Sequence, residues 1–212
     1  MSLVVQNFEN IKSLITNSNV KIIAVSKTFS FEHIKPLVDY GHNHFGENKV
    51  QEAQSKWREI KKSNPGIQLH MIGKLQSNKA KEAVKLFDYI HSVDNPKLAS
   101  LLAKHENTIN KKLSYFIQVN IGNENQKSGI AIKALDEFFY YCTKELKLNI
   151  IGLMAIPPED GKENFYFKSL MELNKLHGLK DLSMGMSGDF KEALKYETTF
   201  IRIGSSIFGK RA

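Results

Sequence analysis

A lysine directly follows a short apolar run near the start of the chain. In "KIIAVSKTFS", residues 21–30, the apolar residues Ile22 to Val25 are typical of a buried strand, and Ser26 and Lys27 come next. Burial disfavours the charged form of a lysine and therefore lowers its pKa toward the neutral, nucleophilic amine. Lys27 is a candidate for either of two roles, a point charge on a phosphate or an amine that forms a Schiff base.

Two small, donor-rich turns later in the chain favour an anionic ligand. "MSGDF" contains Ser187 and Gly188, and "RIGSSIFG" contains Gly204 and Ser205. Turns of this kind after the last two strands of a barrel hold phosphate groups with their backbone N–H groups. The alternative is that both are ordinary tight turns that use glycine and serine. Arg202 brings a further cation to the second turn, which also favours a neutral lysine nearby.

A recurring pattern supplies the elements that would position these residues. A short apolar run, a polar turn and an amphipathic segment follow one another along the chain. Strands are predicted over 21–27, 44–48, 69–74, 89–94, 114–121, 149–156, 181–187 and 199–208. Helices are predicted over 31–40, 49–61, 78–86, 96–106, 131–146, 164–176 and 189–195, with an extra helix over 4–15 before the first strand.

Eight strands alternating with helices leave two architectures, an open doubly wound sheet and a closed barrel. The count of eight favours the barrel, so we expect an α/β fold consisting of a single (β/α)8 TIM barrel with an extra N-terminal helix. One domain is expected to span residues 1–212. Strands one and eight are neighbours only in a closed sheet, and closure would bring Lys27 close to the turn at Gly204.

In a barrel, ligands bind at the carboxyl ends of the strands. Polar residues fall at these predicted ends throughout the chain. They are Lys27, Glu47, Asn48, Lys74, Gln76, Asn78, Asp94, Asn95, Asn120, Ser187, Gly188, Gly204, Ser205 and Ser206.

Composition narrows the class of protein. The formal charge is +8, from 30 Lys and Arg against 22 Asp and Glu, and no run of five like charges occurs. This favours a lysine-rich solvated surface or a phosphorylated small ligand over nucleic-acid binding, which would show salt-dependent affinity.

Cys142 is the only cysteine, which excludes an internal disulfide and a cysteine-rich metal site. No segment approaches the ~18 apolar residues of a membrane span and no signal peptide is visible, so we expect a cytoplasmic protein with no membrane partner.

Several motifs, taken in order, resemble those of the pyridoxal phosphate (PLP) homeostasis proteins. They are "AVSKT", "HFGENKVQE", "HMIGKLQSNKAK", "HSVD", "IQVNI", "QKSGI", "GLMAIPP", "LSMGMSGDF" and "IRIGSSIFGKR", and they run from Ile22 to Arg211. The resemblance implies a barrel similar to the N-terminal domain of alanine racemase. It also implies PLP bound as a covalent aldimine on a lysine.

Carried over to this sequence, the resemblance implies five residues around the cofactor ring. Lys27 forms the aldimine, and Asn48 lies near the ring and its 3-hydroxyl. Met184 and Met186 pack around the ring, and Arg202 faces the pyridine nitrogen.

The resemblance also implies the residues that hold the phosphate. Ser187 contacts it, and Gly204 and Ser205 supply further donors. Gly188 departs from the family pattern, in which a polar residue is frequent. The departure keeps the backbone donors and removes one side-chain contact.

The arginine opposite the ring nitrogen favours a carrier over an enzyme. An arginine donates hydrogen bonds without giving up its proton, so it disfavours protonation of the ring and weakens stabilisation of a carbanion. Alanine racemase takes its second base partly from a further domain, and the sequence ends at Ala212 soon after the last strand. We expect a monomeric PLP binder that holds, delivers or buffers the cofactor, with PLP-dependent apoenzymes or PLP-producing enzymes as partners.

The alternative is a PLP-dependent racemase or a related enzyme. It needs a positioned second base, for which Tyr115, His70 and His91 are the nearest candidates. It also needs a cover against solvent, which the polar loop 121–130 would provide in part.

Two weaker interpretations concern other side chains. His42 and His44 offer two metal ligands with no visible third. Lys74, Lys79 and Lys81 would form either a relay surface for PLP or, more commonly, a solvated helix face.

Overall fold

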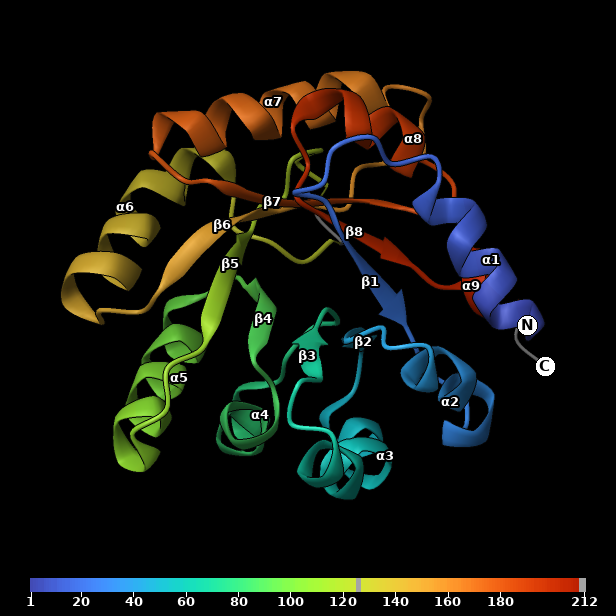
Figure 1. Cartoon of the computed structure of the whole chain (residues 1–212). Helices are drawn as coiled ribbons and strands as arrows, with labels where there is room; N and C mark the ends of the chain where they lie inside the picture. The colour runs from blue at the N-terminus through green and yellow to red at the C-terminus, as the bar shows by residue number, and fades with distance from the viewer. Residues whose placement is uncertain (125–126, 210–212) are drawn as a thin grey trace.

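The chain forms a closed barrel of parallel strands surrounded by helices. The computed structural model describes residues 1–124 and 127–209, and within these ranges eight strands pair in chain order until β8 meets β1. Figure 1 shows the strands at the centre with the helices outside them. The predicted α/β fold, a (β/α)8 TIM barrel preceded by a helix, is confirmed.

The strands are short, and most of their residues are buried on both faces. A parallel strand covered by helices outside and by the barrel interior inside is apolar throughout, which explains the continuous run Ile22–Val25. The strands are β1 (Lys21–Val25), β2 (His44–Glu47), β3 (Gln68–Met71), β4 (Tyr89–Val93), β5 (Ser114–Gln118), β6 (Ile150–Met154), β7 (Asp181–Met186) and β8 (Phe200–Ile203).

Helices connect successive strands on the outside of the barrel. They are α1 (Leu3–Lys12), α2 (Phe31–Asp39), α3 (Val50–Ser63), α4 (Ala80–Leu86), α5 (Pro96–Ile109), α6 (Leu135–Tyr140), α7 (Glu163–Leu176), α8 (Phe190–Ala193) and α9 (Ser205–Phe208). Short 3-10 turns are η1 (Ser77–Lys79), η2 (Ile132–Ala134) and η4 (Leu194–Tyr196), and η3 (Tyr141–Glu145) is a π-helical turn.

Side-chain caps fix where several helices begin. The Asn95 side chain accepts a hydrogen bond from the backbone N–H of Leu98 at 2.9 Å, and Pro96 follows it at the first helical position. Proline fits there because that N–H has no partner within the helix. The helix start predicted at Pro96 is confirmed.

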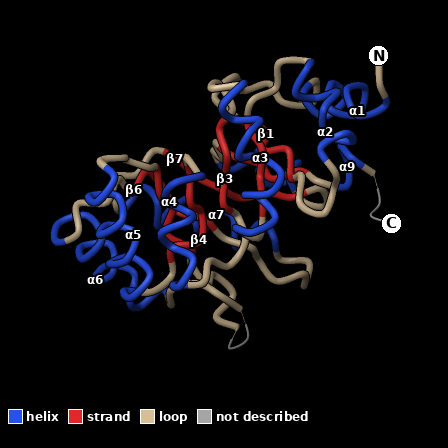
Figure 2. The backbone as a smooth tube through the Cα atoms, turned by 90° about the horizontal axis from the view of Figure 1, so that it is seen from below, coloured by secondary structure: helices blue, strands red, loops and turns tan. Residues whose placement is uncertain are grey.

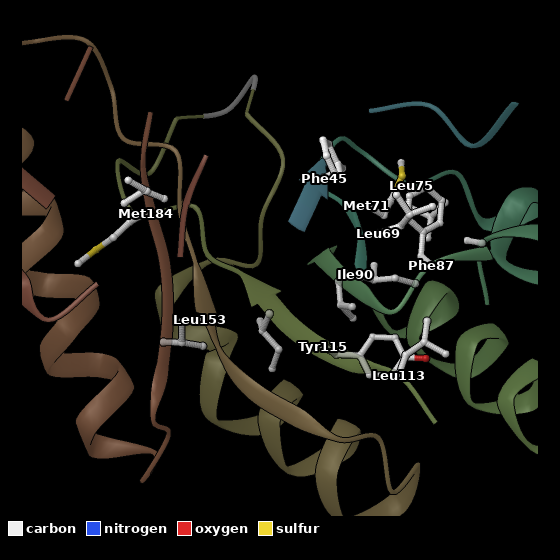
Figure 3. Packing of buried hydrophobic residues seen from close by; sticks show 14 of the residues in the cluster. Phe45, Leu69, Met71, Leu75, Phe87, Ile90, Leu113, Tyr115, Leu153 and Met184 are labelled. Atoms are coloured by element: carbon white, nitrogen blue, oxygen red, sulfur yellow. The ribbon is translucent and has the colours of Figure 1, made fainter. Parts of the chain in front are cut away.

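The apolar side chains form two layers. Ile23, Phe116, Met154 and Phe200 pack together as a small group apart from the main core. The larger layer lies between strands and helices, and Figure 3 shows part of it, including Phe45, Leu69 and Leu153. The inner group is small because polar side chains occupy the rest of the barrel interior.

Glycine allows a close approach of two strands on one side of the barrel. A Cβ atom at Gly152 in β6 would lie 1.9 Å from the carbonyl oxygen of Asp181 in β7. No side chain fits at that distance, so the pairing of β6 with β7 depends on glycine here.

Helix α1 packs against α9, the last helix of the described chain (Figures 1 and 2). Its buried face includes Val4, Phe8 and Ile11, and the Asn7 side chain donates to the carbonyl oxygen of Ile207 at 3.1 Å. Since α9 begins at Ser205, the N-terminal helix anchors the turn that carries two of the predicted site residues.

Several predicted elements differ from the structure, and three of these differences affect residues discussed below. The strand predicted over 199–208 ends at Ile203, and residues 205–208 form α9, because Ile207 and Phe208 are buried by helix packing instead of strand pairing. The helix predicted over 131–146 is divided into η2, α6 and η3. Strand β5 ends at Gln118, so Asn120 lies beyond it in a loop, where its amide bonds the backbone of Glu124.

Some predicted features lie outside the described residues. These include Gln126 of the loop 121–130 and Arg211 of the last motif. Within the described ranges, no helix combines the length and apolar content that crossing a bilayer requires.

We expect Gly152→Ala to destabilise the barrel by about 1–3 kcal/mol, because the added methyl group must push β7 away from β6. Urea denaturation of both proteins measures this difference in the free energy of unfolding. Gly66→Ala is the matched control, since a Cβ atom there meets nothing within 4 Å. Equal losses in the two variants would contradict the close approach.

Candidate functional site

A cavity of about 520 Å³ opens at the carboxyl ends of β1, β7 and β8. Its lining includes all the predicted cofactor-binding residues except Met184. The residues around it are Val25, Lys27, Asn48, Ile72, Ile156, Met186, Ser187, Gly188, Arg202, Gly204 and Ser205. Barrel closure explains why residues from the two ends of the sequence line one cavity, because β1 pairs with β8 and Ile23 lies opposite Arg202.

Met184 does not reach this cavity, which corrects the prediction that it packs around the ring. Its side chain is fully buried in the layer between strands and helices, and Figure 3 shows it pointing toward a neighbouring helix. The adjacent Ser183 contacts Arg202 inside the barrel, and successive side chains of a strand point to opposite faces. Met186 lines the cavity after an irregularity in the pairing of β7 with β8.

Arg202 is a buried cation with a fixed orientation. One guanidinium nitrogen, Nη1, donates to the carbonyl oxygen of Ser183 at 2.7 Å and to its Oγ at 2.8 Å. The other, Nη2, donates to the carbonyl oxygen of Ala155 at 3.0 Å. Burial lowers the pKa of Arg202 to about 10, an effect that the charge of Asp189 partly offsets, so the group keeps its proton at neutral pH.

A hydrogen-bonded line of imidazoles continues from Arg202 through the barrel interior. Ser183 Oγ lies 2.8 Å from His91 Nδ1, and His91 Nε2 lies 2.9 Å from His70 Nδ1. His70 Nε2 lies 2.9 Å from Nδ1 of His44, the first residue of β2. Burial lowers the pKa of His44 to about 4 and that of His70 and His91 well below the ordinary value, so these side chains are neutral near pH 7.

One assignment of tautomers, starting from Arg202, gives every hydrogen bond in this line a donor and an acceptor. Because a guanidinium only donates, Ser183 Oγ accepts from Arg202, and the hydroxyl proton finds an acceptor when His91 Nδ1 is unprotonated. His91 then carries its proton on Nε2 and donates to His70, which donates in the same sense to His44. This assignment satisfies each buried polar atom of the line and supports the guanidinium from behind.

The turns at the other end of the cavity offer backbone donors. Ser187 and Gly188 follow β7, and Gly204 and Ser205 lead from β8 into α9. The first N–H groups of a helical turn have no partner within the helix and are available to an anion. A Cβ atom at Gly188 would meet nothing within 4 Å, so the site has room for the side chain that the family pattern places there.

A second cavity of about 540 Å³ adjoins the first, with Asn48 in the lining of both. Lys49, Lys74 and Lys79 line this second cavity. Lys81 does not line it and is exposed on α4. Of the three lysines for which a relay was considered, Lys74 and Lys79 therefore lie beside the predicted site.

The candidate second bases of a racemase lie elsewhere. Tyr115 is buried in the layer between strands and helices, and burial raises its pKa. His70 and His91 belong to the hydrogen-bonded line inside the barrel. None of the three lines the cavity that contains Lys27.

His42 and His44 take part in the fold's hydrogen bonding. His42 Nε2 lies 2.8 Å from the carbonyl oxygen of His44. Across the described residues, no three His, Cys, Asp or Glu side chains gather in a way that could hold a metal ion.

The neutral histidines predict a loss of stability in acid. Burial lowers the pKa of His42 and His44 to about 4, against about 6.5 in an unfolded chain, so the unfolded state binds more protons as the pH falls. The stabilisation is complete above pH 6.5 and is lost from there toward pH 4, by at most about 1.4 kcal/mol per pH unit for each histidine. Urea midpoints at pH 7.5 and pH 5 measure it. The His44→Gln variant should lose less stability between the two, and an equal loss in both proteins would contradict the burial.

Comparison with known proteins identifies relatives over the whole chain. Residues 2–212 match the family described as alanine racemase, N-terminal domain. A pyridoxal phosphate homeostasis protein of Vibrio alginolyticus is 36% identical over 233 residues, covering 100% of this chain and 99% of that protein. The protein of the same name in Escherichia coli K12 is 36% identical over 91% of this chain and 86% of its own length.

Solved structures agree with this relationship. PipY of Synechococcus elongatus without PLP superposes with a TM-score of 0.90 and 33% identity, covering 97% of this chain and 100% of that chain. The same protein with PLP bound gives a TM-score of 0.89 at 31% identity and the same coverage. An alanine racemase of Clostridium difficile shares the fold, with a TM-score of 0.77 at 13% identity over 98% of this chain and 56% of that one. The chain therefore belongs to the alanine racemase N-terminal domain family, in the group of the pyridoxal phosphate homeostasis proteins.

Proposed function

We propose that this protein binds PLP and serves PLP homeostasis in the cytoplasm, holding the cofactor on Lys27 and releasing it to PLP-dependent apoenzymes. The observation that carries the proposal is the meeting of Lys27, Arg202 and the two donor-rich turns in one cavity. The relatives named PLP homeostasis proteins and the PLP-bound PipY structure support it. We further propose that the protein acts as a monomer.

The cavity suits a small, flat ligand that ends in a phosphate. Its volume of about 520 Å³ lies in the range of small-molecule sites. Val25, Ile72, Ile156 and Met186 supply apolar walls for an aromatic ring. The polar groups differ from one side of the cavity to another, which fixes the orientation of an asymmetric ligand.

Each chemical group of PLP has a counterpart among these residues. Lys27 would take the aldehyde, and Asn48 would lie near the 3-hydroxyl. Arg202 would donate to the pyridine nitrogen, since its hydrogen bonds to Ser183 and Ala155 use three of the five guanidinium N–H groups and leave two for a ligand. The turns at Ser187 and Gly204–Ser205 would hold the phosphate.

The covalent step requires a neutral amine at Lys27. With PLP bound, Nζ would attack the aldehyde carbon, a C=N bond would replace the C=O bond, and the two protons of the amine would leave with the aldehyde oxygen as water. Hydrolysis reverses the step without any other reactant. A reversible bond of this kind suits a protein that stores the cofactor and gives it up.

Arg202 favours holding the cofactor over catalysis with it. PLP is a strong electron sink when its ring nitrogen is protonated, and a guanidinium at that nitrogen disfavours a second positive charge. The line of neutral imidazoles behind Arg202 leaves the guanidinium as the charged group of the network. The site therefore weakens carbanion chemistry while keeping a strong hydrogen bond to the ring.

Lys27→Ala should abolish covalent capture of PLP. The unmodified protein incubated with PLP is expected to gain a visible absorption band, and borohydride reduction should trap a pyridoxyl group on the peptide that contains Lys27. Lys35→Ala, on the exposed face of α2, is the matched control and should behave as the unmodified protein does. A pyridoxyl group on other lysines, at equal yield in the Lys27→Ala protein, would contradict the assignment.

Pyridoxal, which lacks the phosphate, should bind about 100-fold more weakly than PLP. Hydrogen bonds to a charged group contribute roughly 1.5–3 kcal/mol each, and the turns at Ser187 and Gly204 offer several donors. Titration of the absorption band with each compound measures the two affinities. Equal affinities would mean that these turns do not hold the phosphate.

A further inference from the structure

The turn that carries Lys27 contains a strained residue. Thr28 has a φ of 69° in the left-handed region, which a β-branched side chain rarely adopts. Such a conformation persists only when surrounding contacts hold it, and it costs on the order of 1–3 kcal/mol. Since Lys27 precedes Thr28 directly, whatever holds Thr28 also sets the direction in which the Lys27 side chain leaves the backbone.

Glu52 holds the strained residue directly. Its Oε1 accepts a hydrogen bond from the backbone N–H of Thr28. Glu52 lies in the first turn of α3, so the helix that follows β2 reaches back over the end of β1. The same Oε1 also accepts from Lys56 Nζ at 3.2 Å, one helical turn further on.

Lys56 joins the two sides of the turn. Its Nζ donates to the carbonyl oxygen of Ser26 at 2.7 Å and to Glu47 Oε1 at 3.0 Å. The side chain is only 8% exposed, so solvent screens these contacts weakly. Lys56 thus fixes the residue before Lys27, as Glu52 fixes the residue after it.

Glu47 anchors the arrangement in the core. It is fully buried at the end of β2, and its Oε1 also accepts from Ser26 Oγ at 2.7 Å and from Trp57 Nε1 at 2.9 Å. Trp57 packs against Phe45 with ring centroids 4.8 Å apart. All three of these donors meet one oxygen, and Oε2 of Glu47 is buried with no hydrogen-bond partner within the described residues.

We propose that Glu47, Glu52 and Lys56 are positioning residues that hold the Ser26–Thr28 turn in the conformation that aims Lys27 into the cavity. The inference rests on the proposed function, because it concerns the lysine that captures PLP. None of the three contacts the ligand in this account, and each acts through the backbone or hydroxyl of the turn. A buried carboxylate with an unpaired oxygen costs stability, and the placement of Lys27 gives the reason for keeping it.

A double-mutant cycle tests the proposal. Glycine adopts a positive φ without strain, so Thr28→Gly keeps the conformation of the turn and removes the strain that Glu52 must offset. Glu52→Ala should slow the covalent capture of PLP about tenfold when residue 28 is Thr. The same substitution should slow capture less than about twofold when residue 28 is Gly. Glu59→Ala, on the exposed side of α3, is the matched control and should leave the rate unchanged.

Hydrogen exchange provides a readout that needs no ligand. In the protein without PLP, the Thr28 amide should exchange at least about tenfold faster in Glu52→Ala than in the unmodified protein or in Glu59→Ala. Equal slowing of capture in both cycle backgrounds, or an unchanged Thr28 exchange rate, would overturn the proposal. Absence of capture in the unmodified protein would overturn the proposed function instead, and the exchange experiment would still decide whether Glu52 holds the turn.

Discussion

The pairing of β1 with β8 is the contact on which the site depends. It sets Ile23 opposite Arg202 and Ala24 opposite Ile203, so the end of the first strand meets the end of the last. Lys27 and the Gly204–Ser205 turn, which lie near opposite ends of the sequence, then line one cavity. An open sheet built from the same strands would separate them. The packing of α1 on α9 secures this junction from outside, because it fixes the helix into which the turn leads.

Two polar networks lie beside the two basic residues of the site, Arg202 and Lys27. Behind Arg202, Ser183 and the neutral imidazoles of His91, His70 and His44 form a hydrogen-bonded line. Beside Lys27, a buried carboxylate joins strand β2 to helix α3. Both networks cost desolvation, and both orient groups that would face PLP. The interior of this barrel therefore combines the apolar group of Ile23, Phe116, Met154 and Phe200 with polar side chains that lead to the site.

Much of the fold can be predicted from the sequence, because short apolar runs that end in polar residues indicate the strands. Lys27 stands out because it follows the first of these runs. Whether a strand side chain points into the barrel or toward the helices cannot be predicted in this way. Parallel strands are buried on both faces, so apolar and polar residues do not alternate along them. The resemblance alone places Met184 beside the ring, and no pattern in the sequence corrects that placement or indicates the imidazole line. The contacts of Glu47 and Glu52 link the turn after β1, the end of β2 and helix α3. They depend on tertiary packing, so no local sequence pattern predicts them. Ile207 and Phe208 were assigned to a strand because burial by helix packing leaves the same apolar pattern.

A crystal structure of the protein grown with PLP tests the central claim most directly. We expect PLP in the cavity between Arg202 and the Gly204–Ser205 turn, with continuous density from its C4′ atom to Nζ of Lys27. We also expect that Ser183 and the imidazole line keep their positions, because Arg202 is already oriented. PLP bound instead among Lys49, Lys74 and Lys79, with Lys27 unmodified, would contradict the account.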